Sequence, residues 1–363
     1  MDDNSRLGGV VGATSLANAT PIFSEPRLVV VVDTEEEFDW SRPFSRAAIG
    51  VGHIKQQDRA QRILERYGIK PTYAVDFPIA TQAAAYGPLR EWLESGKCDI
   101  GAHLHPWVNP PYDEEVSNLN SFPGNLPSGL EREKLARLTD AIATNFGRQP
   151  KSYRAGRYGI GRATGAILEE LGFRIDTSVV ARTDFRHMGG PDFSAMKTDL
   201  FWFGPSQRIL EVPLTVGWCG LLGRRGGSLQ KVLTTHMANQ FRLPGVCARL
   251  GLYERIRLTP EGASFAEMKR LTDSELEAGN RIFLLSYHSP SVAPGNTPYV
   301  RDGTELEKFL GLIDRYCEYF VATCGGIGST LEEVHELSEG SRGDQDPNRA
   351  PAVLGAKLAR QRH

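Results

Sequence analysis

The sequence lacks a long hydrophobic run, and this absence limits the class of protein. Its longest apolar stretch near the N-terminus is Leu28–Val32, whereas a membrane-spanning helix needs about 20 such residues. Residues Met1–Ile22 include Asp2 and Asp3 and contain no long apolar core, so we expect no secretory signal peptide. We therefore expect no transmembrane segment.

The sequence also lacks a strong charge imbalance, a CxxC pair and an internal repeat. Its 42 lysines and arginines nearly balance its 44 aspartates and glutamates, with a net charge of −2, so we expect no nucleic acid partner. The five cysteines are scattered, which is typical of reduced thiols that pack inside a cytoplasmic protein. No repeat of about 20–50 residues indicates a solenoid. These features leave the oligomeric state open.

Apolar runs alternate instead with amphipathic segments. We predict strands at Arg27–Thr34, Lys70–Phe77, Cys98–Trp107, Ser152–Arg157, Phe173–Val179, Leu200–Phe203, Ile209–Val216 and Ile282–His288. We predict helices at His53–Tyr67, Ile79–Glu94, Leu130–Phe146, Thr164–Leu171, Met237–Leu250, Phe265–Gly279 and Glu305–Phe320. Strands that are mostly followed by helices favour a parallel sheet, closed as a barrel or open and doubly wound.

The chain divides into three predicted parts. Residues 1–24 form an N-terminal extension, residues 25–337 one catalytic barrel, and residues 338–363 a polar tail that we expect to be disordered. α/β barrels commonly form one domain of about 200–250 residues or more. Within the barrel, Val108–Gly129 is rich in proline, asparagine and serine, so we expect a long functional loop there.

Ionisable side chains concentrate where the predicted strands end. The carboxyl ends of parallel strands meet at one edge of a sheet, where active sites form. We therefore expect these side chains to lie together. They are Asp33, Glu35, His103, His105, Arg154, Asp176 and His288.

The pair His103 and His105 predicts a metal site. Residues i and i+2 of a strand project from the same face, so both imidazoles point to one side. Two imidazoles and a carboxylate such as Glu35 suit Zn²⁺, although histidines that are hydrogen-bonded without a metal are an alternative. In the acidic run that follows the first strand, we expect Glu36 and Asp39 to be bystanders.

Two further residues are candidates for acid–base chemistry. Arg154 can hold a carboxylate in a bidentate pair, with a surface arginine as the alternative. His288 ends an apolar strand and can donate a proton near neutral pH, with a core histidine as the alternative.

These motifs together resemble a known family. The motifs are Val32-Asp33-Thr34-Glu35, His103-Leu104-His105-Pro106-Trp107, Arg154-Ala155-Gly156-Arg157-Tyr158-Gly159, Asp176-Thr177-Ser178 and the late strand that ends in His288. In this order they resemble the polysaccharide deacetylase (NodB-homology) superfamily, carbohydrate esterase family 4, and look closest to its WalW-like branch. The resemblance follows the order of elements from Arg27 to Leu337.

The resemblance implies a deformed (β/α)7 barrel that removes N- or O-acetyl groups from glycans. It implies that Asp33 is the base, His103 the first metal histidine, Arg154 the residue that orients the base and His288 the acid. The chain departs from the family at two positions. Thr34 stands where the family has its second aspartate, so Glu35 must substitute or Asp33 must change role. Trp107 stands where the family has its second histidine, so His105 must serve instead.

We therefore predict a metal-dependent hydrolase in which Glu35, His103 and His105 hold a divalent ion, with Zn²⁺ preferred over others. The expected substrate is a carbohydrate: an acetylated sugar, a glycan or a lipid-linked precursor. One alternative is cleavage of another C–N bond or a glycosidic bond, with Asp33 and Asp176 as paired acids. Another is a catalytically inactive glycan-binding protein. Candidate sugar platforms are Tyr158, Trp107 and Trp218.

Overall fold

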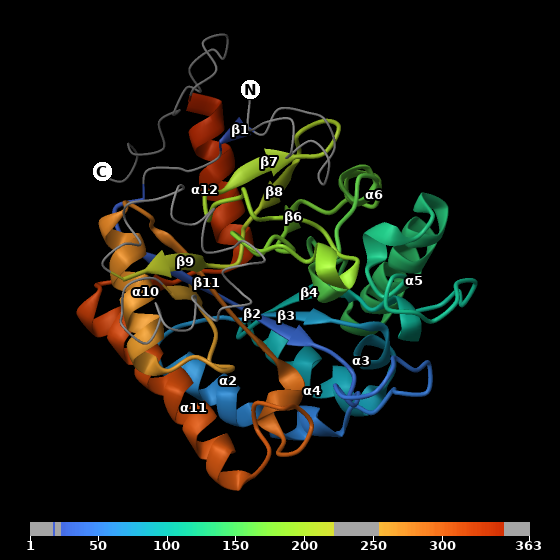
Figure 1. Cartoon of the computed structure of the whole chain (residues 1–363), viewed down its shortest axis with the longest axis horizontal. Coiled ribbons are helices and arrows are strands. Elements are labelled where there is room, and N and C mark those ends of the chain that lie inside the picture. The colour runs from blue at the N-terminus through green and yellow to red at the C-terminus, as the bar shows by residue number, and fades with distance from the viewer. Residues whose placement is uncertain (1–16, 19–22, 221–253, 345–363) are drawn as a thin grey trace, which may run out of the picture.

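The structure of the protein is a computed structural model that describes residues 17–18, 23–220 and 254–344. A curled, mostly parallel sheet lies at its centre and helices surround it (Figure 1). The strands are β1 (Ala17–Asn18), β2 (Arg27–Thr34), β3 (Thr72–Val75), β4 (Asp99–Leu104), β5 (Ser152–Ala155), β6 (Ile175–Asp176), β7 (Phe201–Phe203), β8 (Ile209–Glu211), β9 (Val216–Cys219), β10 (Glu254–Arg257), β11 (Ile282–His288) and β12 (Ile327–Gly328).

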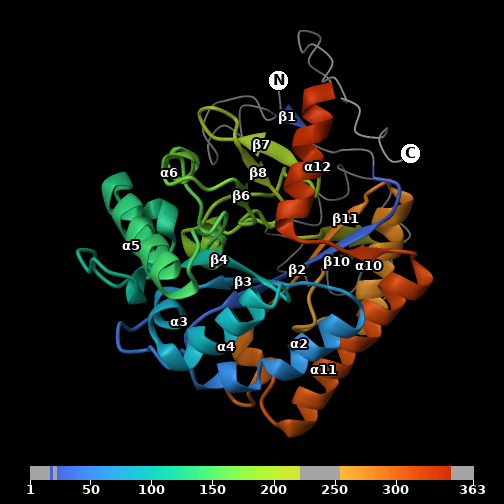
Figure 2. The ribbon, with the colours of Figure 1, turned by 180° about the vertical axis from the view of Figure 1, so that it is seen from behind.

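The helices form a series around the outside of the sheet. They are α2 (Asp58–Arg66), α3 (Phe77–Thr81), α4 (Ala83–Glu94), α5 (Ser128–Phe146), α6 (Thr164–Glu170), α10 (Phe265–Glu277), α11 (Gly303–Glu318) and α12 (Leu331–Asp344). Neighbours along this series pack on one another: α10 on α11, α11 on α2, α4 on α5, and α5 on α6. The view from behind follows the same series, with α11 and α2 on one side and α5 and α6 on the other (Figure 2).

Seven parallel strands carry the architecture, in the order β8-β6-β5-β4-β3-β2-β11. The end strands β8 and β11 do not pair with each other in the described part of the chain. The segment after β8 reaches across instead, because the Leu284 backbone N–H donates to Thr215 Oγ1 at 2.8 Å. The predicted α/β class is thus confirmed as a curled, open half-barrel of seven parallel strands.

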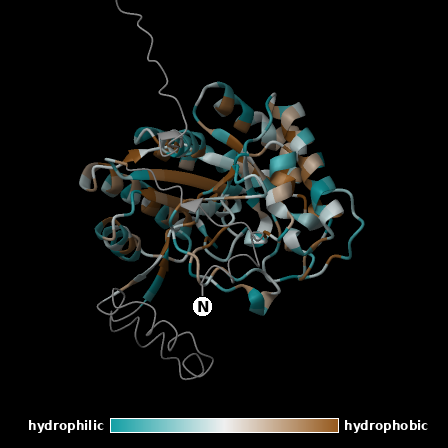
Figure 3. Cartoon of the chain, turned by 90° about the horizontal axis from the view of Figure 1, so that it is seen from above, coloured by the Kyte–Doolittle hydropathy of each residue, from teal (hydrophilic) through white to brown (hydrophobic). Residues whose placement is uncertain are grey.

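The apolar run of β2 places it in the middle of the sheet. Residues Leu28 to Thr34 are all buried, as expected for a parallel strand covered on both faces. Seen from above, apolar residues concentrate in the central strands, while the outer faces of the helices carry polar ones (Figure 3). The register of β2 against β11 pairs Asp33 with His288, and that of β4 against β5 pairs His103 with Arg154.

Several predicted elements differ in detail. The helix expected over Ile79–Glu94 is two helices, α3 and α4. Strand β6 is limited to Ile175–Asp176. Helix α12 includes Ser338, the first residue of the segment expected to be a tail, and continues to Asp344. The helix predicted at 237–250 lies outside the described residues. No helix in the described part is long and apolar enough to span a membrane.

Candidate functional site

The ends of β2 and β4 bring three predicted metal ligands together. Glu35 Oε2 lies 3.4 Å from His103 Nε2 and 3.5 Å from His105 Nε2. One ligand atom from each residue lies within 4.8 Å of the other two, so the trio could hold a metal ion. All three side chains are buried, each with only 3% of its surface exposed.

The local backbone explains why both imidazoles face Glu35. Strand β4 ends at Leu104, but His105 keeps an extended conformation, with φ −97° and ψ 104°, before Pro106 begins a short 3-10 turn. The alternation of side chains therefore continues one residue beyond the strand. Gly156 makes room for this turn, because a Cβ there would lie 2.3 Å from the Leu104 carbonyl oxygen and 2.6 Å from His105 Cδ2.

Hydrogen bonds at the far side of each ring orient the two imidazoles. His103 Nδ1 lies 3.0 Å from the Arg154 carbonyl oxygen, to which it can only donate. His105 Nδ1 lies 2.8 Å from Glu36 Oε2. With Nδ1 as the donor in both rings, each Nε2 carries the lone pair that faces Glu35. Metal-binding histidines typically have this arrangement.

Glu36 belongs to this site, although the sequence analysis predicted it to be a bystander. Its carboxylate accepts from His105 and also from Trp107 Nε1 at 2.7 Å, and its backbone N–H donates to Asp76 Oδ2 at 2.7 Å. The bystander prediction was wrong because residue i+1 of a strand normally points away from its neighbour. Here the chain has left β2, which ends at Thr34, so the alternation no longer holds.

Burial sets the electrostatics of this cluster. Burial and then the neighbouring acids, Glu36 first, raise the pKa of Glu35 well above its usual range. Burial also raises the pKa of Glu36 to about 7. For the histidines, burial lowers the pKa of His105 to about 4 and that of His103 well below its usual range. Both imidazoles are therefore neutral at pH 7, which is the form that binds metal ions.

Asp33 lies beside the trio and has cationic partners. Its Oδ1 is 2.8 Å from Arg154 Nε, an ion pair without the alignment of a hydrogen bond. Its Oδ2 is 3.7 Å from His288 Nε2. Arg154 is fully buried, and its other nitrogens donate to Ser286 Oγ at 3.1 Å and Thr177 Oγ1 at 3.4 Å. The surface alternative for Arg154 is therefore wrong, since the guanidinium lies inside the barrel against Asp33.

His288 is held by an acid that the sequence analysis did not find. Its Nδ1 lies 2.7 Å from Glu261 Oε2, and its backbone N–H donates to Glu261 Oε1 at 3.1 Å. Burial disfavours a charged imidazole here, but the carboxylates of Glu261 and Asp33 outweigh it and raise the pKa of His288. Glu261 lies in the segment after β10, outside any predicted element, so only the tertiary structure could reveal the pair.

Asp176 lies in a different cluster. Its side chain accepts from Ser178 Oγ at 2.5 Å, and β6 pairs it in register with Glu211 of β8. Burial raises the pKa of both acids, and the positive charge of Arg154 opposes this rise. The structure therefore places Asp176 in a buried carboxyl pair with Glu211 and does not bring it into the Glu35 trio.

A hydrogen-bond chain supports Glu35 from behind. The Glu35 backbone N–H donates to Ser289 Oγ at 3.3 Å, Ser289 Oγ is 2.7 Å from His53 Nε2, and His53 Nδ1 is 3.1 Å from Glu37 Oε1. With Nδ1 of His53 as a donor to Glu37, every hydrogen bond in this chain has one donor and one acceptor. Glu37 thus belongs to the support of the site.

Exposed aromatic rings border the site at His288. Trp40 packs edge-on against His288 with ring centroids 4.9 Å apart, and Tyr299 packs against Trp40 at 5.8 Å. Their exposed fractions are 36% for Trp40 and 40% for Tyr299. Trp107, a predicted sugar platform, is buried instead and uses its indole N–H on Glu36. That prediction was therefore wrong.

No protein-family model and no curated protein sequence matches the chain. Among similar solved structures, a protein from Mycobacterium smegmatis assigned to the polysaccharide deacetylases is 15% identical, with 90% of this chain and 96% of that one covered and a TM-score of 0.49. The peptidoglycan deacetylase PdaC from Bacillus subtilis is 9% identical, with 88% and 95% covered and a TM-score of 0.39. A family GH57 branching enzyme from Thermococcus kodakaraensis is 12% identical, with 86% and 71% covered and a TM-score of 0.47.

Two of these three structures are described as deacetylases, and the superfamily stays a resemblance of the sequence motifs. The narrower WalW-like branch stays a prediction.

Proposed function

We propose that the protein is a metal-dependent hydrolase that removes acyl groups, above all acetyl groups, from a carbohydrate. The observation that carries this proposal is the convergence of Glu35, His103 and His105, with the lone pairs of both Nε2 atoms directed at one carboxylate. The ion pair of Asp33 and Arg154 lies directly beside this trio. Zn²⁺ and a cytoplasmic location remain predictions from the sequence.

The residues fit a divalent cation. Glu35 Oε1 is buried without a hydrogen-bond partner in the described part of the chain, and a buried polar atom of this kind is costly unless something binds it. The acids crowded around Glu35 repel one another, and a cation would offset that repulsion. An ion held by Glu35, His103 and His105 would supply Lewis acidity that polarises an acyl carbonyl and acidifies water.

The remaining residues suit the proton transfers of acyl hydrolysis. Asp33, paired with Arg154, is placed to accept the proton of the attacking water. His288 is placed to protonate the leaving amine or alkoxide, since Glu261 favours its charged form. A base and an acid that face each other across 3.7 Å can serve the two halves of one hydrolysis. Tyr299 and Trp40 offer apolar ring faces on which a sugar can pack.

Metal analysis and acetate release from a panel of acetylated sugars test the proposal. We expect the purified protein to bind one divalent ion, and the His103→Ala variant to lose both the ion and at least about a hundredfold in hydrolysis, because even residues behind metal ligands cost about 10–100-fold. His187→Ala is the matched control, since His187 is exposed in a short turn away from the trio. Metal-independent cleavage of glycosidic bonds would instead support the glycosidase alternative, and tight glycan binding without hydrolysis the inactive one.

A further inference from the structure

A cavity of about 200 Å³ opens beside His288. Strand β10 and the segment that follows it line one side, and Tyr299 lines another. None of the three proposed metal ligands borders this cavity. His288, its partner Glu261 and Tyr299 belong to both the cavity and the candidate site, so the cavity lies where the part of a substrate next to the leaving group would be.

Two arginines of β10 supply positive charge to this cavity. Arg255 and Arg257 lie two residues apart on one strand, so they project from the same face. Arg257 donates to the Tyr158 hydroxyl and packs over the Tyr158 ring at 5.0 Å, and Arg255 donates to Thr183 Oγ1 at 2.6 Å. Neither guanidinium forms an ion pair with a carboxylate in the described part of the chain. Burial disfavours the charged form of Arg257, but Tyr158 and the nearby carboxylates of Asp33 and Glu261 outweigh it and raise the pKa of Arg257. Both guanidinium groups can therefore bind an anionic ligand.

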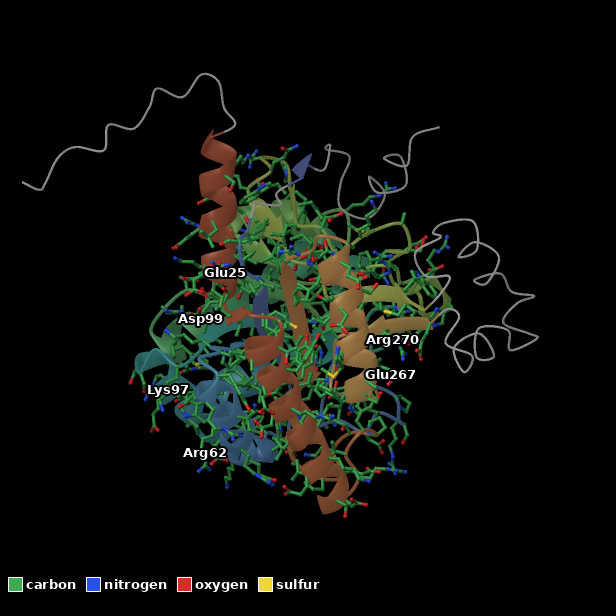
Figure 4. All side chains as sticks on the ribbon, turned by 90° about the vertical axis from the view of Figure 1, so that its left-hand side faces the viewer. Glu25, Arg62, Lys97, Asp99, Glu267 and Arg270 are labelled. Carbon is green, nitrogen blue, oxygen red and sulfur yellow. The ribbon has the colours of Figure 1, made fainter. Side chains whose placement is uncertain are left out.

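The carboxylates that line the same cavity are already engaged. Glu254 pairs with Arg270 of α10. Glu267 closes the capping box at the start of that helix, where it accepts from the Ser264 backbone N–H at 2.6 Å. Glu267 and Arg270 are labelled in Figure 4. Glu261 is held by His288 and by Ser291. Among the charged groups that line the cavity, the two arginines are thus the cations that form no ion pair in the described part of the chain, which favours an anion.

Tyr158 connects this cavity to the ion pair of Asp33 and Arg154. Its ring lies 5.0 Å from the Arg257 guanidinium and 5.3 Å from that of Arg154, which holds Asp33. On the outer side, Tyr299 lines the cavity, and the exposed ring of Trp40 packs against it. A substrate at His288 would thus meet aromatic faces and two guanidinium groups at once.

We infer that this cavity binds an anionic substituent, a carboxylate or a phosphate, on the carbohydrate whose acyl group is removed. The inference rests on the proposed function and deepens it, because it names the substrate class as acidic sugars. The rings of Trp40 and Tyr299 pack on the sugar, and Arg255 and Arg257 bind its charged group.

Isothermal titration with three sugars that lack an acyl group tests the inference: glucose, glucuronate and glucose 1-phosphate. We expect one of the two anions to bind the wild-type protein at least about tenfold more tightly than glucose, because hydrogen bonds to charged groups are strong. A preference for glucuronate identifies a carboxylate, and a preference for the phosphate ester identifies a phosphate. Equal binding of all three sugars would overturn the inference.

Variants assign that preference to the two arginines. Arg255→Gln and Arg257→Gln should each reduce anion binding about tenfold and leave glucose binding unchanged, while Arg257→Lys should recover part of the loss because it keeps the charge. Arg59→Gln on α2 is the matched control, since it removes an exposed arginine that does not line the cavity. Anion binding that survives the double Arg255→Gln, Arg257→Gln variant, with its thermal unfolding unchanged, contradicts the assignment.

These measurements separate the two proposals. None of the three sugars can be deacetylated, so their binding does not depend on turnover, and titration of the metal-free protein keeps it independent of a bound metal ion. If the metal and hydrolysis tests fail while the anion preference persists, the hydrolase assignment is wrong and the anion site stands. If hydrolysis is found but glucose, glucuronate and glucose 1-phosphate bind equally well, the anion site is wrong and the hydrolase stands.

Discussion

At the scale of single residues, the same couple recurs three times: a glutamate that accepts from the Nδ1 atom of a histidine. Glu36 holds His105 at 2.8 Å, Glu261 holds His288 at 2.7 Å, and Glu37 holds His53 at 3.1 Å. Each couple fixes the tautomer and leaves Nε2 facing the interior of the site. The pKa values of two of these histidines nevertheless shift in opposite directions. Burial lowers the pKa of His105 to about 4, whereas at His288 the carboxylates of Glu261 and Asp33 outweigh burial and raise the pKa.

The Glu261–His288 couple leads to a prediction about pH. If His288 is the general acid, activity falls as pH rises through its pKa, which Glu261 raises. Glu261→Gln removes that negative charge and lowers the pKa of His288, so we expect the alkaline limb of the kcat profile to move to lower pH. A shift of about one unit corresponds to about 1.4 kcal/mol. The measurement is kcat against pH for both proteins.

Ser291 provides the control for this experiment. Ser291→Ala removes a hydrogen bond to Glu261 but leaves its carboxylate in place, so the limb should move less. An unchanged profile in Glu261→Gln, with activity retained, means that His288 is not the acid.

At the scale of elements, the clearest features of the fold were predictable and the tertiary partners were not. The limits of β2 and β11 matched the predicted Arg27–Thr34 and Ile282–His288, because uninterrupted apolar runs leave little choice of structure. Strand β6 was predicted much longer than it is, since Phe173–Val179 has the composition of a strand but pairs over only two residues.

The same distinction between predictable and unpredictable features applies to the residues of the candidate site. Glu35, His103 and His105 could be predicted because strand ends and an i, i+2 spacing are visible in the sequence. Glu36 and Glu261 could not, since their partners lie 69 and 27 residues away. Trp40 and Tyr299 likewise meet only in the folded chain, and nothing local distinguishes them from the buried Trp107.

The turn between β5 and the next helix gives a prediction at this scale. Gly156→Ala places a methyl group against the Leu104 carbonyl and the His105 ring, so the ends of β4 and β5 must move apart. We expect a loss of about 1–3 kcal/mol in the free energy of unfolding, as is typical of overpacking, together with weaker metal binding. Urea unfolding and metal titration measure the two effects.

A glycine elsewhere controls for the substitution itself. Gly311 lies within α11 with open space at its Cβ position, and alanine there should stabilise the protein by about 0.5–1 kcal/mol, because glycine is the poorer helix former. Equal unfolding midpoints for Gly156→Ala and the wild type would contradict the predicted crowding.

At the scale of the whole molecule, the buried acids of the candidate site lower the stability of the folded protein. The half-barrel gathers Asp33, Glu35, Glu36, Asp76 and Glu261 in its interior, and charges buried without compensation destabilise the folded state. Because the pKa of Glu35 is raised in the folded protein, its contribution to stability is greatest at low pH and is lost as pH rises through that folded value. The metal-free protein should therefore become less stable as pH rises toward neutrality.

Replacing the acid by its neutral isostere tests this trade-off. We expect Glu35→Gln to raise the thermal unfolding midpoint of the metal-free protein at pH 7 by a few degrees, since about 1 kcal/mol moves the midpoint by about 2–4 °C in domains of 150–250 residues. The same variant should lose the stabilisation that added Zn²⁺ gives the wild type, because a ligand that binds the folded state raises its stability. Glu307→Gln, on the exposed face of α11, should change neither. If the metal-free Glu35→Gln protein is no more stable than the wild type, Glu35 is already neutral at pH 7. Glu35 would then have to lose its proton when it binds a metal ion. Zn²⁺ titration in weakly buffered solution would in that case release protons.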